Sequence, residues 1–382
     1  MRIFASTLTL LWLCAAAVPL AVGIEHVEVQ DDKGRRQLKG EIVVEAKDGG
    51  LMLRTDDGGL HLLLARHITS RRTDDEPFKL LEREELGKRI LAELPPGFQI
   101  HDSTNYLICY NTTRSYAIWT SSLLERLNKA FLAFWKRKGC ELEVPSQPLP
   151  VLIFSDEQSY ADYAQAELGP GAASVIGYYS LTTNRIMMYD LTGLQSLRRE
   201  ESLRGSRRDI SVLLSLPAAE PLVATIVHEA THQIAFNCGL QTRFADNPIW
   251  MSEGMAVFFE TPDLSSSRSW RGIGSVNYPR WDHYCDLEAD DALIPLPQLL
   301  SDDQTFRTRD TALDAYAQAW AWNYFLIKWR PKEYVAYLKE IAAKPVLIQD
   351  TPKQRLADFK RHFGDDLEAL QDEFDRRMDR VK

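Results

Sequence analysis

The segment from Pro221 to Phe236 constrains the fold most, because it places three ionisable side chains inside an apolar helical pattern. Pro221 suits the first turn of a helix, and Gly239 lies where that helix could end. The apolar residues recur at the spacing of a buried helix: Leu222, Val223, Ile226, Val227, Ala230 and Ile234. Polar groups on a buried helix need partners, since burying them unpaired is costly. The fold must therefore supply partners for the two histidines and the glutamate of this segment.

The spacing of these residues indicates a metal as the partner. His228 and His232 leave one face of the helix about one turn apart, so both can reach one zinc ion at roughly 2.0–2.1 Å. Glu229 points about 100° away around the axis, where its carboxylate can take a proton from a water held by the metal. This His-Glu-x-x-His arrangement is typical of metal-assisted hydrolysis. The alternative is a chance match, which is uncommon in a chain with only eight histidines.

A third ligand is expected from the next helix, which begins at Asn247-Pro248, a typical cap and first position. Glu253 lies inside its apolar run, beside Trp250 and Met251, where a lone carboxylate needs a cation. A zinc ion would provide that cation. The alternative is a solvent-facing glutamate on an amphipathic helix.

Taken together, His228-Glu-x-x-His232 and Trp250-Met-Ser-Glu253-Gly254-Met-Ala256 resemble the gluzincin branch of the zincin peptidases, the thermolysin-like or peptidase-MA-like superfamily. The likeness is greatest to an uncharacterised secreted bacterial branch whose ligand helix reads Trp-x-x-Glu-Gly-x-Ala. It covers roughly residues 98–345. The resemblance implies a Zn²⁺ cofactor with Glu253 as third ligand, Glu229 as general base, and hydrolysis of peptide bonds in a peptide or protein substrate. The related metzincins carry a third histidine soon after the second, which the sequence after His232 lacks.

The sequence departs from thermolysin around the third ligand, where Ser252 and Val257 replace an asparagine and an aspartate. We therefore expect Glu260, two turns after Glu253, to orient the first histidine. Tyr316, on a helix predicted from Leu313 to Trp329, is the candidate for stabilising the tetrahedral oxyanion, with a core aromatic as the alternative.

Two further side chains and one strand are weaker candidates. His283 and Tyr284 are additional candidates for the site. In such folds an edge strand aligns the substrate through main-chain hydrogen bonds. The hairpin from Val175 to Tyr189 is the candidate here, with the strand from Arg185 to Tyr189 at the edge.

The N-terminal residues predict export. Leu8 to Val18 is an apolar run, broken by Pro19 and followed by the small residues Ala21-Val22-Gly23. This pattern indicates a signal peptide over residues 1–23 and a secreted or periplasmic protein. The alternative is an uncleaved membrane anchor, for which the run is short. No second apolar stretch is long enough to cross a bilayer.

The net charge limits the classes of binding partner, and the cysteines indicate which disulfides could form. The formal net charge of −9 argues against nucleic acid or an anionic membrane surface as the main partner. The exported chain would keep Cys109, Cys140, Cys238 and Cys285, which could form two disulfides in any of three pairings or remain buried thiols.

The chain as a whole predicts an α+β protein. Short strands separated by Gly-rich turns indicate a small β domain over residues 24–76, with the polar stretch from Arg71 to Glu76 as a linker. A zincin-like metallopeptidase domain, with a mixed sheet and active-site helices, is expected over residues 77–345. Residues 346–382 are expected to form C-terminal helices packed on it, and residues 195–208 an irregular surface excursion. The competing function is a non-catalytic exported zinc-binding module for protein or cell-wall partners.

Overall fold

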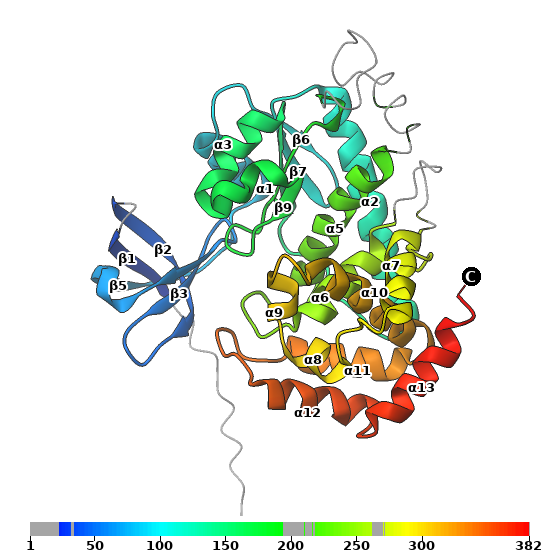
Figure 1. Ribbon diagram of the computed structural model, residues 1–382. Coiled ribbons are helices and arrows are strands. Elements are labelled where there is room, and N and C mark those ends of the chain that lie inside the picture. The colour runs from blue at the N-terminus through cyan, green and yellow to red at the C-terminus, as the bar shows by residue number, and fades with distance from the viewer. Residues whose placement is uncertain are drawn as a thin grey trace, which may run out of the picture. The chain divides into compact units, whose positions relative to one another are not determined.

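The computed structural model describes residues 23–31, 34–193, 210, 216, 218–261, 270 and 272–381. The first 22 residues of the predicted signal peptide and the predicted excursion at 195–208 lie outside the described residues. The chain divides into two compact units, coloured blue and cyan to red in Figure 1. Of the described residues, the first comprises those from 23 to 56 and from 61 to 80, and the second comprises those from 57 to 60 and from 81 to 381. The protein therefore has the mixed α and β content that the sequence predicts.

The first unit is an antiparallel sheet with strand order β4-β3-β2-β1-β5. Its small core contains Val27, Val29, Leu51, Leu53 and Leu63. The strands are β1 (Gly23–Asp31), β2 (Gly34–Glu45), β3 (Leu51–Thr55), β4 (Leu60–Leu63) and β5 (Ile68–Pro77), with a 3₁₀ turn at Ala65–His67 before β5.

The stretch from Arg71 to Glu76 is part of β5, so its prediction as a linker was wrong. Its charged side chains have cross-strand partners, which the sequence pattern alone does not reveal. Arg71 donates to the buried carboxylate of Glu25 and, over 2.7 Å, to Glu45. Thr73 donates to the other oxygen of Glu25 over 2.6 Å. A polar segment can thus complete a sheet when the neighbouring strands offer matching charges.

The second unit contains a mixed sheet of order β6-β7-β8-β10-β9. Its strands are β6 (Gln99–Asp102), β7 (Tyr106–Tyr110), β8 (Leu149–Phe154), β9 (Gly177–Tyr179) and β10 (Ile186–Tyr189). β7, β8 and β10 run parallel and are buried throughout, as apolar central strands are. The prediction that the strand from Arg185 to Tyr189 lies at the edge was wrong. β10 pairs with β8 on one side and β9 on the other, which leaves β9 at the edge.

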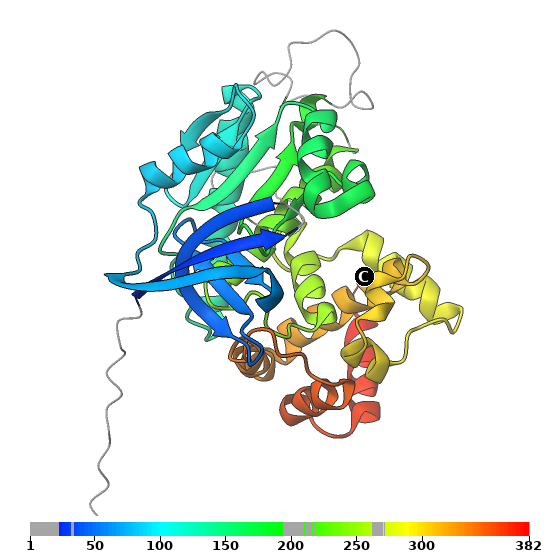
Figure 2. The same ribbon diagram turned by 90° about the vertical axis from the view of Figure 1, so that its left-hand side faces the viewer.

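Helices cover this sheet and continue beyond it. α1 (Arg83–Glu93), α2 (Arg114–Arg137) and α3 (Glu157–Leu168) contact the strands, with Gly169–Ser174 and Leu191–Gly193 as 3₁₀ turns. α5 (Ala219–Asn237) lies between the sheet and the C-terminal helices (Figures 1 and 2). Those helices are α6 (Ile249–Phe259), α7 (Tyr278–Ala289), α8 (Leu296–Ser301), α9 (Gln304–Arg307), α10 (Ala312–Trp329), α11 (Pro331–Ala342), α12 (Pro352–Phe363) and α13 (Leu367–Met378).

The structure also bears on membrane-spanning helices and on the state of the cysteines. Within the described ranges, no helix combines the length and apolar character needed to cross a bilayer. All four cysteines that follow the predicted signal peptide are free thiols. Cys109, Cys140 and Cys238 are buried, as the second alternative expects, whereas Cys285 is only partly buried.

The glycine of the Trp-x-x-Glu-Gly pattern has a packing role. A Cβ on Gly254 of α6 would lie 2.1 Å from Asn323 Nδ2 and 2.4 Å from the Ala319 carbonyl oxygen, both on α10. Asn323 is fully buried and donates to the carbonyl of Trp250 over 2.9 Å. Gly254 therefore lets the two helices touch, and this contact holds the helix that carries Glu253.

We expect Gly254→Ala to lower the free energy of unfolding by about 1–3 kcal/mol, the usual cost of overpacking a core. Alanine has a higher helix propensity than glycine, by roughly 1 kcal/mol, and this gain offsets only part of the steric cost. Gly87→Ala in α1 is the matched control, because there the nearest atom is the mobile end of the Ile100 side chain, at 2.8 Å. Urea denaturation of both variants measures the difference. Equal stability of the two variants would contradict the packing role.

Candidate metal centre

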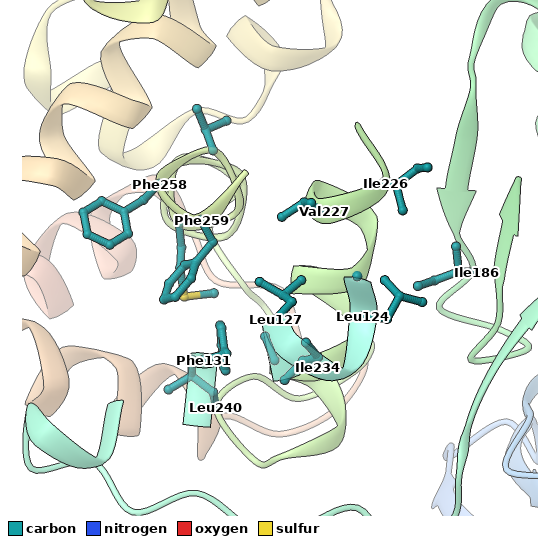
Figure 3. Close-up of a cluster of buried hydrophobic side chains, with 14 of the residues drawn as sticks. Leu124, Leu127, Phe131, Ile186, Ile226, Val227, Ile234, Leu240, Phe258 and Phe259 are labelled. Atoms are coloured by element: carbon teal, nitrogen blue, oxygen red, sulfur yellow. The ribbon is translucent and has the colours of Figure 1, made fainter. Parts of the chain in front are cut away.

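The apolar side of α5 is fixed within the core of the second unit. Figure 3 shows Ile226, Val227 and Ile234 of α5 beside residues from α2, β10 and α6. The neighbouring side chains labelled there are Leu124, Leu127, Phe131, Ile186, Leu240, Phe258 and Phe259. The helix cannot rotate without breaking these contacts, so the direction of its histidines is set by the packing.

α5 and α6 bring the three predicted ligands together. His228 Nε2 lies 3.1 Å from Glu253 Oε2 and 3.2 Å from His232 Nε2. His232 Nε2 lies 3.4 Å from Glu253 Oε1. Zinc bonds of roughly 2.0–2.1 Å in tetrahedral geometry place ligand atoms about 3.3 Å apart. The group of His228, His232 and Glu253 could therefore hold a metal ion, and its nitrogen and oxygen donors suit zinc.

A second layer of side chains orients the first histidine. His228 Nδ1 lies 2.9 Å from Glu260 Oε2, which is the contact expected from the sequence. Glu260 accepts a further hydrogen bond over 2.9 Å from Asn277, the residue that caps α7. With its Nδ1 proton bound to Glu260, His228 can present a free Nε2 to a metal. Asn277 carries no signal in the sequence, because it belongs to the site only through Glu260.

The electrostatic surroundings of His228 and Glu253 favour a positive charge between them. Burial alone would lower the pKa of His228, but hydrogen bonds to Glu253 and Glu260 raise it well above its ordinary value. Burial would raise the pKa of Glu253, but His232 and His228 hold it well below its ordinary value. Positive charge is thus stabilised where the three ligand atoms meet.

Glu229 lies beside this group and is held by the edge strand. Its carboxylate accepts a hydrogen bond over 2.8 Å from the backbone N–H of Tyr179 in β9. Burial raises the pKa of Glu229, while the nearby His228 and His232 lower it. The edge strand thus contributes to the site through a main-chain donor, which side-chain spacing in the sequence could not indicate.

These residues open onto one cavity of about 530 Å³. His228, His232, Glu229 and Glu253 all line it, together with Tyr316 from α10. Apolar side chains form another part of the lining: Leu181, Phe236, Phe244 and Leu347. The cavity has the mixed character of a ligand site, with an apolar wall and a few converging polar groups.

Tyr316 is the one weaker candidate that the structure places at the site. Burial and the adjacent Glu253 carboxylate raise the pKa of its phenol, so its hydroxyl keeps its proton and can donate a hydrogen bond. The other two candidates have different surroundings. His283 Nε2 lies 2.7 Å from Asp314, and Tyr284 is buried and stacks on Trp281.

Comparison with known proteins adds one match. Residues 222–347 match the model of a family described as "Protein of unknown function (DUF1570)". The matched segment includes nearly all of α5, all of α6 and α10, and with them His228, Glu229, His232, Glu253 and Tyr316. No curated protein matches the chain. The chain is thus similar to this family over the part that forms the candidate centre.

Proposed function

We propose that this protein is an exported zinc metallopeptidase of the gluzincin type, with a zincin-like catalytic domain in its second unit. The observation that carries the proposal is the convergence of three ligand residues, in which His228 Nε2 lies 3.2 Å from His232 Nε2 and the two nitrogens lie 3.1 and 3.4 Å from the two oxygens of Glu253. His228, His232 and Glu253 would hold the ion. When bound, zinc supplies Lewis acidity and makes a nearby water more acidic.

Each of the neighbouring residues has a role in the proposed hydrolysis. Glu229 takes the proton of the attacking water and later returns it to the leaving amine. The Tyr179 N–H holds that carboxylate in place. Tyr316 donates a hydrogen bond to the substrate oxygen as negative charge develops on it. Glu260 keeps His228 in the orientation that a metal requires.

The cavity supports an enzyme over the non-catalytic zinc module. All three ligand residues line it, so a substrate carbonyl can approach the metal from that side. Catalytic zinc sites combine three protein ligands with an open position, whereas structural sites are closed by a fourth protein ligand. The presence of Glu229 on the same cavity wall adds the base that a binding module would not need.

Hydrolysis of a peptide library by the purified protein tests the proposal. We expect cleavage by the zinc-loaded protein, its loss on treatment with a chelator, and its recovery when zinc is added back. Mass spectrometry of the products locates the cleaved bonds. Cleavage that persists in the chelator, or a zinc-loaded protein that cleaves no member of the library, would contradict the proposed function. The second result would favour the non-catalytic module.

A further inference from the structure

Among the described residues, the charged side chains that line the cavity have ion-pair or hydrogen-bond partners, with one exception. Arg355 forms ion pairs with Asp246 over 2.5 Å and with Asp303 over 2.9 Å. The two histidines and Glu253 form the metal group. Arg307 lines the same cavity, and among the described residues its guanidinium has no ion-pair or hydrogen-bond partner. The cavity therefore offers one free cation in addition to the metal.

The backbone of Arg307 is held firmly next to the proposed catalytic groups. Arg307 is the last residue of the short helix α9. The preceding Phe306 is buried, and its ring packs edge-on against Tyr316 with centroids 5.6 Å apart. Asp303, at the start of α9, accepts a hydrogen bond over 3.1 Å from the backbone N–H of Ile249 at the start of α6. α9 is thus attached both to Tyr316 and to the helix that carries Glu253.

We propose that Arg307 makes the metal site selective for peptides that carry a carboxylate near the bond to be cleaved. This inference rests on the proposed function and names its substrate class. A guanidinium can bind a carboxylate with two parallel hydrogen bonds, which gives direction as well as affinity. The apolar wall formed by Phe236, Phe244 and Leu347 faces the same space and accommodates a neighbouring apolar side chain.

The substrate carboxylate that binds Arg307 has two possible sources, and each predicts a different kind of peptidase. An aspartate or glutamate side chain would make the protein an endopeptidase with acidic specificity. The C-terminal carboxylate of the substrate would make it a carboxypeptidase. Both place the same group against Arg307, so an experiment must vary the two sources separately.

Binding rather than turnover provides the test. The zinc-loaded Glu229→Gln variant is incubated with N-acetylated hexapeptide libraries, and the bound fraction is identified by mass spectrometry. One library carries glutamate at a scanned position and an amidated C-terminus. The second carries glutamine there and a free C-terminus, and the third carries glutamine and an amide. We expect at least one carboxylate-bearing library to be enriched about 10-fold or more over the third, as a charged hydrogen bond allows.

Two variants assign the preference to Arg307. Arg307→Gln should remove the enrichment, and Arg307→Lys should keep part of it, because lysine retains the charge without the planar fork. Arg309→Gln is the matched control, since Arg309 is exposed nearby but does not line the cavity, and it should keep the full enrichment. Equal retention of the three libraries, or enrichment that survives Arg307→Gln, would overturn the inference. A protein that shows the preference but cleaves nothing would refute the proposed function alone.

Discussion

Glu229→Gln should retain the metal and lose at least about 100-fold, and up to about 10⁴-fold, of the rate of peptide hydrolysis. The substitution keeps the size of the side chain and removes only its ability to accept a proton. The Tyr179 N–H can still donate to the amide oxygen, so the local structure should be preserved. The rate is measured on the best substrate of the peptide library, and bound zinc is measured on the same protein.

Two other glutamate-to-glutamine changes make this result specific. Glu253→Gln should weaken metal retention, because a ligand carboxylate becomes a neutral amide. Glu220→Gln, in the first turn of α5 and exposed, should alter neither metal retention nor rate. If Glu229→Gln lost the zinc while Glu253→Gln kept it, the roles assigned to these two residues would be reversed.

Arg355→Ala should lower the free energy of unfolding by about 3–5 kcal/mol, because it leaves the buried carboxylate of Asp246 without a counter-charge. Asp246 is 1% exposed, and both of its oxygens accept from the guanidinium, over 2.9 and 2.5 Å. Asp303 would lose its ion-pair partner as well and keep only the hydrogen bond from the Ile249 N–H. These contacts join α12 to the segments that directly precede α6 and α9, so metal affinity should fall along with stability.

Arg361→Ala on the same helix is the matched control. The Arg361 side chain is 56% exposed and pairs with Glu340 at the surface. Surface ion pairs are worth about 0–1 kcal/mol, so this variant should stay close to the wild type. Denaturant unfolding gives both values. A loss of stability in Arg355→Ala no larger than in Arg361→Ala would show that the buried ion pairs do not anchor α12.

The local parts of the centre could be predicted from sequence. The spacing of His228 and His232 fixes their common face on a helix, and the apolar run around Glu253 marks a carboxylate that needs a cation. The contact of Glu260 with His228 also followed from helical spacing, because Glu253 and Glu260 lie two turns apart.

The remaining features depend on pairing between distant segments. The order of β9 and β10 depends on which strand meets β8, and alternation within a short apolar strand does not decide this. The Tyr179 N–H reaches Glu229 only because β9 is the edge strand. Arg355 and Asp246 are 109 residues apart, so no local pattern relates them. The same reason explains why the charged strand β5 resembles a linker in the sequence.

The central claim is that His228, His232 and Glu253 hold one metal ion. The most direct test is the zinc content of the purified protein, before and after dialysis against zinc, beside His232→Ala prepared in the same way. The account predicts one zinc per chain in the wild type and little or none in the variant, since two remaining ligands bind zinc poorly. A wild-type protein that takes up no zinc, or a His232→Ala variant that retains a full equivalent, would contradict it.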